Sequence, residues 1–373
     1  MAKVLFLTNS SSGFYSFRRE LVDELLKAHQ VVLCMPAEAR TDYFQDAGCK
    51  IEDCSFDRHG TNLIQELRLL YFYKVLLRRE KPDIVFTYTI KPNVYGGLAC
   101  QRLGIPYCAN ITGLGTAVEN GGLMQHITLA LYRCGLRGAQ KVFFQNTMNQ
   151  DFMLSRHVVR QGQYDLLPGS GVNLAQYQPT PYPNGDSVDF LFISRVMKEK
   201  GIDQYLEAAR EIRARHPETR FHVCGRCEQD YEPLLQKLQE EGVVLYHGSI
   251  TDVAGMHRTC ACTVHPSYYP EGMSNVLLES CACGRPIITT NRPGCGEIVD
   301  DGVNGFVVRE KDSADLVEKI EKFLSLPWER RRDMGLAGRA KVEKEFDRQI
   351  VVKKYLDELA AVQSGEERHA QTV

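Results

Sequence analysis

Two glutamates lie eight residues apart in a segment whose composition suits the binding of a charged, hydroxyl-bearing ligand. The segment reads HPSYYPEGMSNVLLES and contains Glu271 and Glu279. A short apolar run ends at His265, and a helix is predicted to begin near Ser274. Both carboxylates and a helix N-terminus then lie at the carboxyl end of a strand, where open α/β sheets bind ligands. Carboxylates accept hydrogen bonds from hydroxyl groups and a helix N-terminus binds phosphate, so the segment suits a nucleotide-sugar.

Two cations, Arg195 and Lys200, occur in the segment SRVMKEKGID, directly after a predicted strand and before a predicted helix. Their five-residue spacing lets both side chains reach one anion from a loop. Fixed cations and helix-end amides stabilise negative charge on a leaving group without reorganising. The competing interpretation is a solvated basic loop.

The elements that position these residues follow from hydrophobic periodicity. Short apolar runs alternate with helical patterns such as Val94–Leu103, Leu123–Gly138 and Gly201–Arg215. This alternation predicts parallel sheets covered on both faces by helices. The predicted strands are Lys3–Thr8, Val31–Met35, Asp83–Tyr88, Pro106–Asn110, Lys141–Phe144, Asp189–Ile193, Arg220–Cys224, Val243–Tyr246, Cys262–His265 and Pro286–Thr289.

The alternation stops between Leu167 and Asp189, where four prolines mark an interdomain linker. The predicted organisation is a domain at residues 1–170, a linker at 171–187 and a second domain at 188–345. A final helix at 346–363 and a polar tail at 364–373, expected to be frayed, complete the chain.

Composition limits the class of protein. Hydrophobic residues make up 43% of the 373 residues and charged residues 25%, with a net charge of −2. These values are ordinary for a soluble globular protein, and no run approaches the ~18–20 apolar residues of a membrane span. The thirteen cysteines are an odd number without a signal peptide, which predicts reduced thiols in the cytosol.

The segment EGMSNVLLESCACGRP, from Glu271 to Pro286, closely resembles the donor-binding signature of family 4 retaining glycosyltransferases. The resemblance covers nearly the whole chain. It implies an α/β GT-B fold, with two Rossmann-like domains facing across a cleft and the last helix crossing back to the N-terminal domain. The motif variant resembles the branch that builds bacterial surface polysaccharides and lipid-linked glycans, including polyprenyl-diphosphate-sugar N-acetylgalactosaminyltransferases.

The resemblance implies roles for individual donor-site residues. Arg195 and Lys200 match the pair that holds the donor diphosphate, Glu271 faces the sugar ring, and Glu279 binds the ribose hydroxyls. Glu297 matches a position near the donor but is equally a helix-start carboxylate. The remaining donor-binding candidates are Gly13, Gly272, Met273, Ser274 and Asn275. For Gly13, which lies in the first strand-to-helix loop, a helix-capping role is the alternative.

The acceptor site is predicted in the N-terminal domain, from Ser12, Lys91, Asn93, Thr112 and Gly113. For Lys91 and Asn93, a pre-proline turn at a helix start is the alternative. Many relatives place a histidine at the end of the strand Pro106–Asn110, whereas this chain has NITGLG there. The loop amides would serve instead. In a front-face retaining reaction the departing phosphate oxygen takes the acceptor proton, and positioning carries much of the catalysis.

Together, the residues and the resemblance predict a retaining glycosyltransferase that moves a sugar from a UDP-sugar to a polyprenyl-diphosphate-linked glycan. An N-acetylhexosamine such as GalNAc is the preferred sugar. No Asp-x-Asp triplet occurs, so transfer is expected without a metal or other cofactor, and no nucleic acid partner is expected. The alternatives are another UDP-hexose transferase for polysaccharide or lipopolysaccharide, a UDP-sugar 2-epimerase, and a non-catalytic nucleotide-sugar-binding module.

The segment Leu63–Lys81 mixes leucines and aromatic residues with five cations. One interpretation is a basic amphipathic helix on an anionic membrane surface. The other is a buried sheet-covering helix with a solvated basic edge. The predicted location is the cytoplasm, peripherally at the inner face of the cell membrane.

Overall fold

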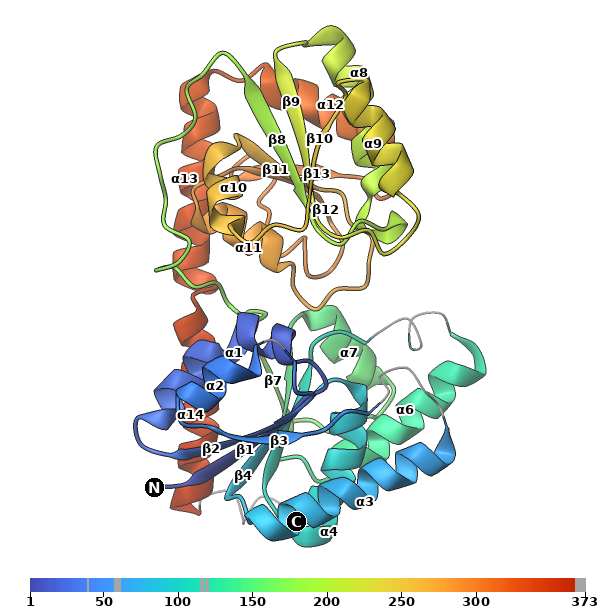
Figure 1. The fold of residues 1–373 in the computed structure, drawn as a ribbon, viewed down its shortest axis with the longest axis vertical. Coiled ribbons are helices and arrows are strands. Elements are labelled where there is room, and N and C mark those ends of the chain that lie inside the picture. The colour runs from blue at the N-terminus through green and yellow to red at the C-terminus, as the bar shows by residue number, and fades with distance from the viewer. Residues whose placement is uncertain (39, 57–61, 115–117, 119–120, 366–373) are drawn as a thin grey trace. The chain divides into compact units, whose positions relative to one another are not determined.

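The computed structural model describes residues 1–38, 40–56, 62–114, 118 and 121–365, which form two compact units (Figure 1). The N-terminal unit contains Met1–Ser170 and the chain from Gln349 onward, and the C-terminal unit contains Gly171–Arg348. The linker residues therefore cluster with the C-terminal unit. Most of the predicted frayed tail, residues 366–373, lies outside the described residues.

The N-terminal unit contains a seven-stranded parallel sheet in the order β3-β2-β1-β4-β5-β6-β7. Five of these strands agree with the sequence prediction within about two residues. The other two, β3 and β7, have four and three residues and include charged side chains, so they lack a continuous apolar run. The strands are β1 Lys3–Leu7, β2 Gln30–Met35, β3 Lys50–Asp53, β4 Ile84–Tyr88, β5 Tyr107–Ile111, β6 Lys141–Phe144 and β7 Tyr164–Leu166.

Helices cover both faces of this sheet, and each face has its own apolar core. One core is built by α1 (Ser11–Leu26), α2 (Thr41–Asp46) and α14 (Arg348–Ser364). The opposite core is built by α3 (Leu63–Glu80), the π-helical turn η1 (Pro92–Gly96), α4 (Gly97–Leu103), α6 (Gly122–Leu136) and α7 (Thr147–Ser155).

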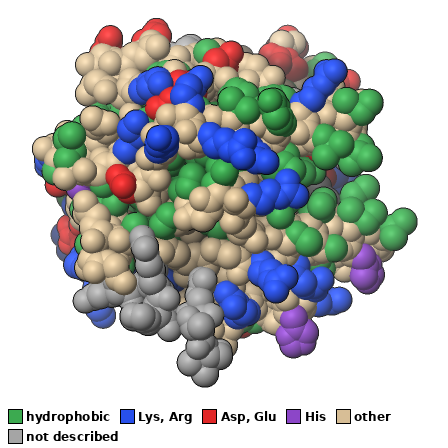
Figure 2. Space-filling view, turned by 90° about the horizontal axis from the view of Figure 1, so that it is seen from below, with side chains coloured by type: hydrophobic (Ala, Val, Ile, Leu, Met, Phe, Trp, Pro, Cys, Tyr) green, Lys and Arg blue, Asp and Glu red, His purple; other side chains and the backbone are tan. Residues whose placement is uncertain are grey.

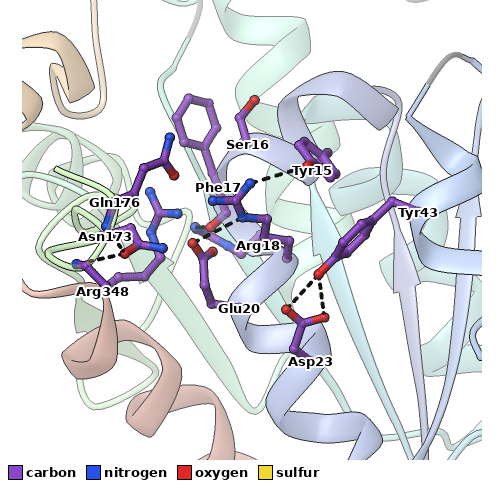
Figure 3. Close-up of polar contacts among 12 residues, drawn as sticks. Tyr15, Ser16, Phe17, Arg18, Glu20, Asp23, Tyr43, Asn173, Gln176 and Arg348 are labelled. Atoms are coloured by element: carbon purple, nitrogen blue, oxygen red, sulfur yellow. Dashed lines mark hydrogen bonds and ion pairs between the residues drawn. The ribbon is translucent and has the colours of Figure 1, made fainter. Parts of the chain in front are cut away.

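A buried chain of hydrogen bonds ties α14 to the rest of the N-terminal unit. Arg18 donates from Nε to the Tyr88 hydroxyl at 3.1 Å, and Tyr88 donates to the Tyr355 hydroxyl at 2.8 Å. Tyr355, on α14, donates to Oδ1 of Asn110. Arg18 also donates to the carbonyl of its neighbour Phe17 at 2.8 Å, so the buried cation is held by neutral oxygens. Figure 3 shows this stretch of α1, where the hydroxyl of Tyr43 also contacts the carboxylate of Asp23. The last helix is thus part of the N-terminal unit's interior.

The C-terminal unit contains a six-stranded parallel sheet in the order β10-β9-β8-β11-β12-β13. Its strands are β8 Val188–Ile193, β9 Thr219–Cys224, β10 Leu245–Gly248, β11 Cys262–His265, β12 Ile287–Thr290 and β13 Gly305–Val308. Its helices are the 3₁₀ turn η2 Lys198–Lys200, α8 Ile202–Arg215, α9 Glu232–Glu240, α10 Val253–Thr259, α11 Asn275–Ala282, α12 Ser313–Leu324 and α13 Trp328–Glu345.

One strand of this unit is displaced from its predicted position. The sequence predicts a strand at Val243–Tyr246, but β10 begins at Leu245. The amides of Val243 and Val244 instead donate to the carbonyl of Leu238 at 2.8 and 3.4 Å, which closes the end of α9. The apolar run is therefore shared between a helix end and a strand.

Each sheet is wound outward in both directions from its first strand, so the strand order reverses beside that strand. In the C-terminal unit the reversal lies between β8 and β11, which are hydrogen-bonded neighbours. Ligands of open α/β sheets bind outside the carboxyl ends of the strands at such a point. Among the described residues, no helix combines the length and apolar character needed to cross a bilayer.

Candidate functional site

The loops after β8 and β11 bring the predicted donor-site residues together within the C-terminal unit. The loop after β8 carries Arg195 and ends in η2, which contains Lys200. The loop after β11 carries Glu271 and leads to α11. Because β8 and β11 are neighbours in the sheet, residues about 70 positions apart in the sequence share one site at the switch point.

Lys200 and Glu271 form an ion pair at the centre of this site. Lys200 is only 6% exposed, and its ammonium contacts Oε1 of Glu271. His265 Nε2 and Ser267 Oγ each lie 3.3 Å from the same oxygen. Burial by itself would raise the pKa of Glu271, but the Lys200 charge and the His265 hydrogen bond lower it to about 2. The site therefore holds a desolvated, ionised carboxylate.

The two loops are fixed to each other by backbone contacts. The amide of Tyr268 donates to the carbonyl of Glu199 at 2.9 Å. Gly201, directly after Lys200, has φ +79°, and a Cβ there would lie 2.2 Å from the carbonyl oxygen of Pro266. Only glycine tolerates both the left-handed backbone and this close approach. The backbone geometry that brings Lys200 to Glu271 therefore requires glycine at position 201.

Arg195 lies beside Lys200 but is more exposed. Its Nη1 pairs with Oε2 of Glu228 at 2.8 Å, and its guanidinium lies 5.1 Å from the ring centroid of Tyr269. The Lys200 ammonium lies 4.7 Å from the same ring. Burial lowers the pKa of Arg195, but Tyr269 and Glu228 outweigh that effect and raise it. Sequence reasoning did not identify Tyr269, although its place between the strand end and Glu271 is a usable signal.

A glycine-bracketed turn packs against the N-terminus of α11. Ser274, the N-cap, donates its amide to the carbonyl of Gly294 at 2.7 Å, and its hydroxyl makes no capping bond. Gly294 has φ +85°, and its own amide donates to Oε2 of Glu297 at 2.7 Å. Glu297 thus shapes the turn opposite the helix. Met273 is buried in the apolar cluster beneath it, and Gly272, also buried, precedes Met273 in the same loop.

Two polar side-chain atoms at this helix start have no hydrogen-bond partner within the described structure. They are Oγ of Ser274 and Oδ1 of Asn275, and both atoms are buried. The first-turn amides of a helix also lack intrahelical acceptors. The α11 N-terminus thus has hydrogen-bonding capacity that the described residues do not use, and the helix dipole favours an anionic group there.

Glu279 lies further along α11, with its side chain mostly buried. Its Oε2 lies 3.8 Å from Nε2 of the buried His257. Burial, together with the charge of Glu279 and a hydrogen bond to it, raises the pKa of Tyr177. Glu279 is thus held beside an imidazole and a phenol.

Among the described residues, one group could offer ligand atoms to a metal ion. His265, Glu271 and Cys295 each present such an atom, all within 4.8 Å of one another. The Lys200 ammonium already contacts the carboxylate of this group, and burial raises the pKa of the Cys295 thiol. A divalent cation would have to displace an ammonium and ionise a buried thiol, so the geometry favours the ion pair.

In the N-terminal unit, Ser12 and Gly13 lie in the first turn of α1. The sequence predicts that the preceding polar loop runs to Gly13, but the helix begins at Ser11. Ser10 caps it, accepting from the amide of Gly13 at 3.2 Å. This is the helix-capping arrangement that the sequence left open as an alternative. Ser12 is exposed at the start of the helix.

The other acceptor candidates differ in accessibility. Lys91 pairs with Oε1 of Glu66, on α3, at 2.7 Å. Asn93 is fully buried, where it accepts from Thr87 Oγ1 at 2.6 Å and donates to the carbonyl of Asn110 at 2.9 Å. The observed role of both residues is to hold the turn η1 against its neighbours.

The loop after β5 presents Thr112 and Gly113. Thr112 is exposed, and Gly113 has φ +152°. Residues 115–117 and 119–120, which include Gly115, lie outside the described residues. Asn110, which stands near the end of β5 where many relatives have a histidine, donates from Nδ2 to the Thr87 carbonyl at 3.1 Å. The side-chain amide of Asn110 therefore already has a hydrogen-bond partner within the N-terminal unit.

Comparison with known proteins agrees with this geometry. Residues 178–341 match the family of glycosyl transferases group 1, and residues 3–146 match the glycosyl transferase 4-like family. The chain is 30% identical to MJ1178, a glycosyltransferase of Methanocaldococcus jannaschii, over 76% of each protein. It is 24% identical to N,N'-diacetylbacillosaminyl-diphospho-undecaprenol alpha-1,3-N-acetylgalactosaminyltransferase of Campylobacter jejuni, over 95% of this chain and 97% of that protein.

A solved structure shows the same fold. Anabaena HepE in complex with UDP and glucose has a TM-score of 0.79, with 19% sequence identity, covering 97% of this chain and 100% of that one. Together with the two parallel-sheet units, this confirms the GT-B fold and the resemblance seen in the sequence. The chain therefore belongs to the GT-B glycosyltransferases, with a 4-like N-terminal half and a group 1 C-terminal half.

Proposed function

We propose that this glycosyltransferase moves an N-acetylhexosamine, preferably GalNAc, from a UDP-sugar to a polyprenyl-diphosphate-linked glycan, with retention and without a metal ion. The observation that carries the donor assignment is the buried Lys200–Glu271 pair in the loop that leads to the α11 N-terminus, whose N-cap side chain makes no capping bond. The acceptor class is supported by the Campylobacter jejuni relative, whose name states a diphospho-undecaprenol substrate and GalNAc transfer.

The C-terminal unit supplies the charges that this reaction needs. Arg195 and Lys200 would hold the donor diphosphate, with the first amides of α11 as further donors. As the sugar–oxygen bond breaks, negative charge grows on the departing phosphate oxygen, and these groups stabilise it without moving. This is the work that a divalent ion does at other diphosphate sites. We infer that the two cations take its place.

Glu271 would orient the sugar, because an ionised carboxylate is a strong acceptor for sugar hydroxyls. Its low pKa keeps it ionised throughout the physiological range, which makes it unsuitable as a general acid or base. The proton of the acceptor hydroxyl would pass to the departing phosphate oxygen on the same face of the sugar, so the new bond forms with retained configuration. Glu279 would hold the ribose of the nucleotide.

The acceptor would bind the N-terminal unit, with the exposed Thr112 and Ser12 as the most accessible predicted contacts. A polyprenyl chain remains in a membrane while its diphosphate and glycan reach the enzyme. We therefore propose that the protein works at the cytoplasmic face of the cell membrane.

The test is a panel of UDP-sugars offered with a polyprenyl-diphosphate-sugar acceptor in the presence of EDTA. UDP release and the mass of the lipid product are measured. Acceptor-dependent release with one sugar added is expected, together with a loss of turnover of at least about 100-fold in Glu271→Gln. Product only after added metal would refute metal-free transfer. Epimerised UDP-sugar without acceptor would identify an epimerase, and UDP binding without turnover a binding module.

A further inference from the structure

The outward faces of α3 and α6 in the N-terminal unit expose large apolar side chains. On α3 the exposed apolar residues are Leu63, Ile64, Leu67, Tyr71 and Val75. Tyr71 is 70% exposed, although it lies in the middle of an 18-residue helix. The opposite side of the same helix buries Leu69, Tyr73, Leu76 and Leu77 in the core. The helix is therefore apolar on both sides, which a helix that only covers a sheet does not require.

The same pattern recurs on α6, which the sequence did not single out as a membrane candidate. Leu123, Met124, Ile127 and Leu131 are exposed, and Leu123 is 77% exposed. Leu129, Tyr132 and Leu136 face the core on the opposite side. Both helices pack against α4 and η1 in one layer on the same face of the sheet. We call the outward surface of α3, α4 and α6 the α3–α6 face.

The charges of the α3–α6 face have one sign. Its cations are Arg68, Lys74, Arg78, Arg102, Arg133 and Arg137. Helices α4 and α6 contain no Asp or Glu, and the two glutamates of α3, Glu66 and Glu80, are buried. Within the described structure, Arg68, Lys74 and Arg78 form no ion pair. Figure 2 views the molecule from the side on which Figure 1 draws α3 and α4, and it shows hydrophobic side chains next to Lys and Arg side chains.

We propose that the α3–α6 face docks on the surface of an anionic lipid bilayer. Exposed aliphatic side chains would enter the boundary between headgroups and acyl chains, and the unpaired cations would meet lipid phosphates. The inference rests on the proposed function, because a polyprenyl-linked acceptor is presented at such a surface.

Other occupants fit these side chains less well. A second copy of the chain would bring a like-charged face against this one, which costs free energy. A nucleic acid would be bound by cations and aromatic platforms, whereas the apolar residues here are mainly aliphatic. An acidic protein would match the charge, but lipid phosphates and acyl chains match both the charge and the aliphatic surface.

Vesicle binding tests the proposal with the intact protein and no substrates. Sedimentation is measured with vesicles of phosphatidylcholine alone and with vesicles containing about one-third phosphatidylglycerol. We expect binding to the anionic vesicles only, weakened in 0.5 M NaCl because salt screens exposed charges. The triple variant Arg68→Gln, Lys74→Gln and Arg78→Gln should bind about 100-fold more weakly, at about fivefold per cation.

Matched variants separate this surface from total charge. The control for the cations changes two arginines and one lysine on the exposed surface of the C-terminal unit: Arg210→Gln, Lys237→Gln and Arg330→Gln. It should bind like the unmodified protein.

An apolar pair, Leu67→Gln with Leu123→Gln, should weaken binding at least about tenfold. Its control is Leu234→Gln with Leu336→Gln, which changes exposed leucines of the other unit.

The proposal is overturned if the protein does not bind anionic vesicles, or if the α3–α6 variants bind as well as their controls. If the protein binds immobilised acidic proteins but no vesicles, the α3–α6 face belongs to a protein partner instead. A parallel assay uses a short-chain, water-soluble diphosphate-sugar acceptor. Normal transfer to that acceptor by a variant that no longer binds vesicles separates the two hypotheses, because it leaves the proposed reaction intact.

Discussion

The buried pair of Lys200 and Glu271 allows a quantitative prediction. The pKa of Glu271 falls from 4.5 to about 2. At about 1.4 kcal/mol per pH unit, this corresponds to about 3 kcal/mol in favour of the ionised carboxylate. The charge of Lys200 is the largest favourable cause. Lys200→Met keeps the length of the side chain but leaves a buried carboxylate without its cation, so we expect the C-terminal unit to lose about 3 kcal/mol of stability at pH 7.

The protein contains its own probe for this measurement. Trp328 is the single tryptophan, and it lies in the C-terminal unit, where its indole donates to the carbonyl of Pro183 at 2.7 Å. Its fluorescence during urea unfolding therefore reports on the unit that contains the ion pair. With a slope of about 2 kcal/mol per molar urea, a loss of 3 kcal/mol lowers the unfolding midpoint by about 1.5 M.

A double-mutant cycle decides whether the pair itself is responsible. Glu271→Gln alone leaves Lys200 buried without a counter-charge and should also destabilise the unit. The double variant, Lys200→Met with Glu271→Gln, removes both charges and should be more stable than the sum of the single effects predicts. We expect a coupling free energy of about 2–3 kcal/mol. A coupling below about 0.5 kcal/mol would refute the reasoning, because the two side chains would then act independently.

Three further predictions follow from contacts described above. Because the folded-state pKa of Glu271 lies below its unfolded value, its stabilising contribution is full above about pH 4.5 and is lost as the pH falls toward 2. The stability difference between the unmodified protein and Glu271→Gln, followed by urea unfolding from pH 6 to 3.5, should therefore shrink. Gly201→Ala should cost at least about 2 kcal/mol, whereas Gly242→Ala, with φ +71° but open space around its Cβ, should cost about 1 kcal/mol. Equal effects in urea would contradict the predicted clash. Tyr355→Phe removes the donor to Asn110 and the acceptor of Tyr88, at about 1 kcal/mol each, and should lower Tm by about 4–8 °C in scanning calorimetry, while an unchanged Tm would mean that the buried chain adds no stability.

Much of the fold could be predicted from the sequence, for a physical reason. Strands buried on both faces of a parallel sheet are continuous apolar runs, so β1, β4 and β11 stand out from their surroundings. Edge strands are short and partly polar, which is why β3 and β7 escape prediction. The run at Val243 is apolar for a different reason, since its first residues close a helix.

Some features of the candidate site could likewise be predicted from the sequence, and others could not. The sequence places Arg195, Lys200 and Glu271 on loops that meet, because the loops after neighbouring strands meet at one sheet edge. It does not reveal that Lys200 pairs with Glu271 itself, or that Tyr269 lies beside both cations. Such partners are fixed by side-chain packing between segments about 70 residues apart, and no local pattern records them.

The polar residues at the turn η1 in the N-terminal unit illustrate the same limit of sequence-based prediction. Lys91 and Asn93 look like ligand-binding residues because they are polar and follow a strand. The structure places the partner of Lys91 on α3, 25 residues earlier in the chain, and encloses Asn93 between β4 and β5. Polarity at a strand end thus indicates an obligation to form hydrogen bonds, and it does not tell whether the partner is a ligand or the protein.

The position of α14 has a consequence for how the protein is made. Val351, Val352, Tyr355 and Leu359 belong to the core of the N-terminal unit, yet they are synthesised only after the whole C-terminal unit. Until they emerge from the ribosome, the first half of the chain lacks one wall of its core, and the hydroxyl of Tyr88 lacks its acceptor. The C-terminal unit, by contrast, is contiguous in sequence and can fold as soon as Arg348 is available. Of the two units, the one whose synthesis begins earlier is therefore the one that is completed later.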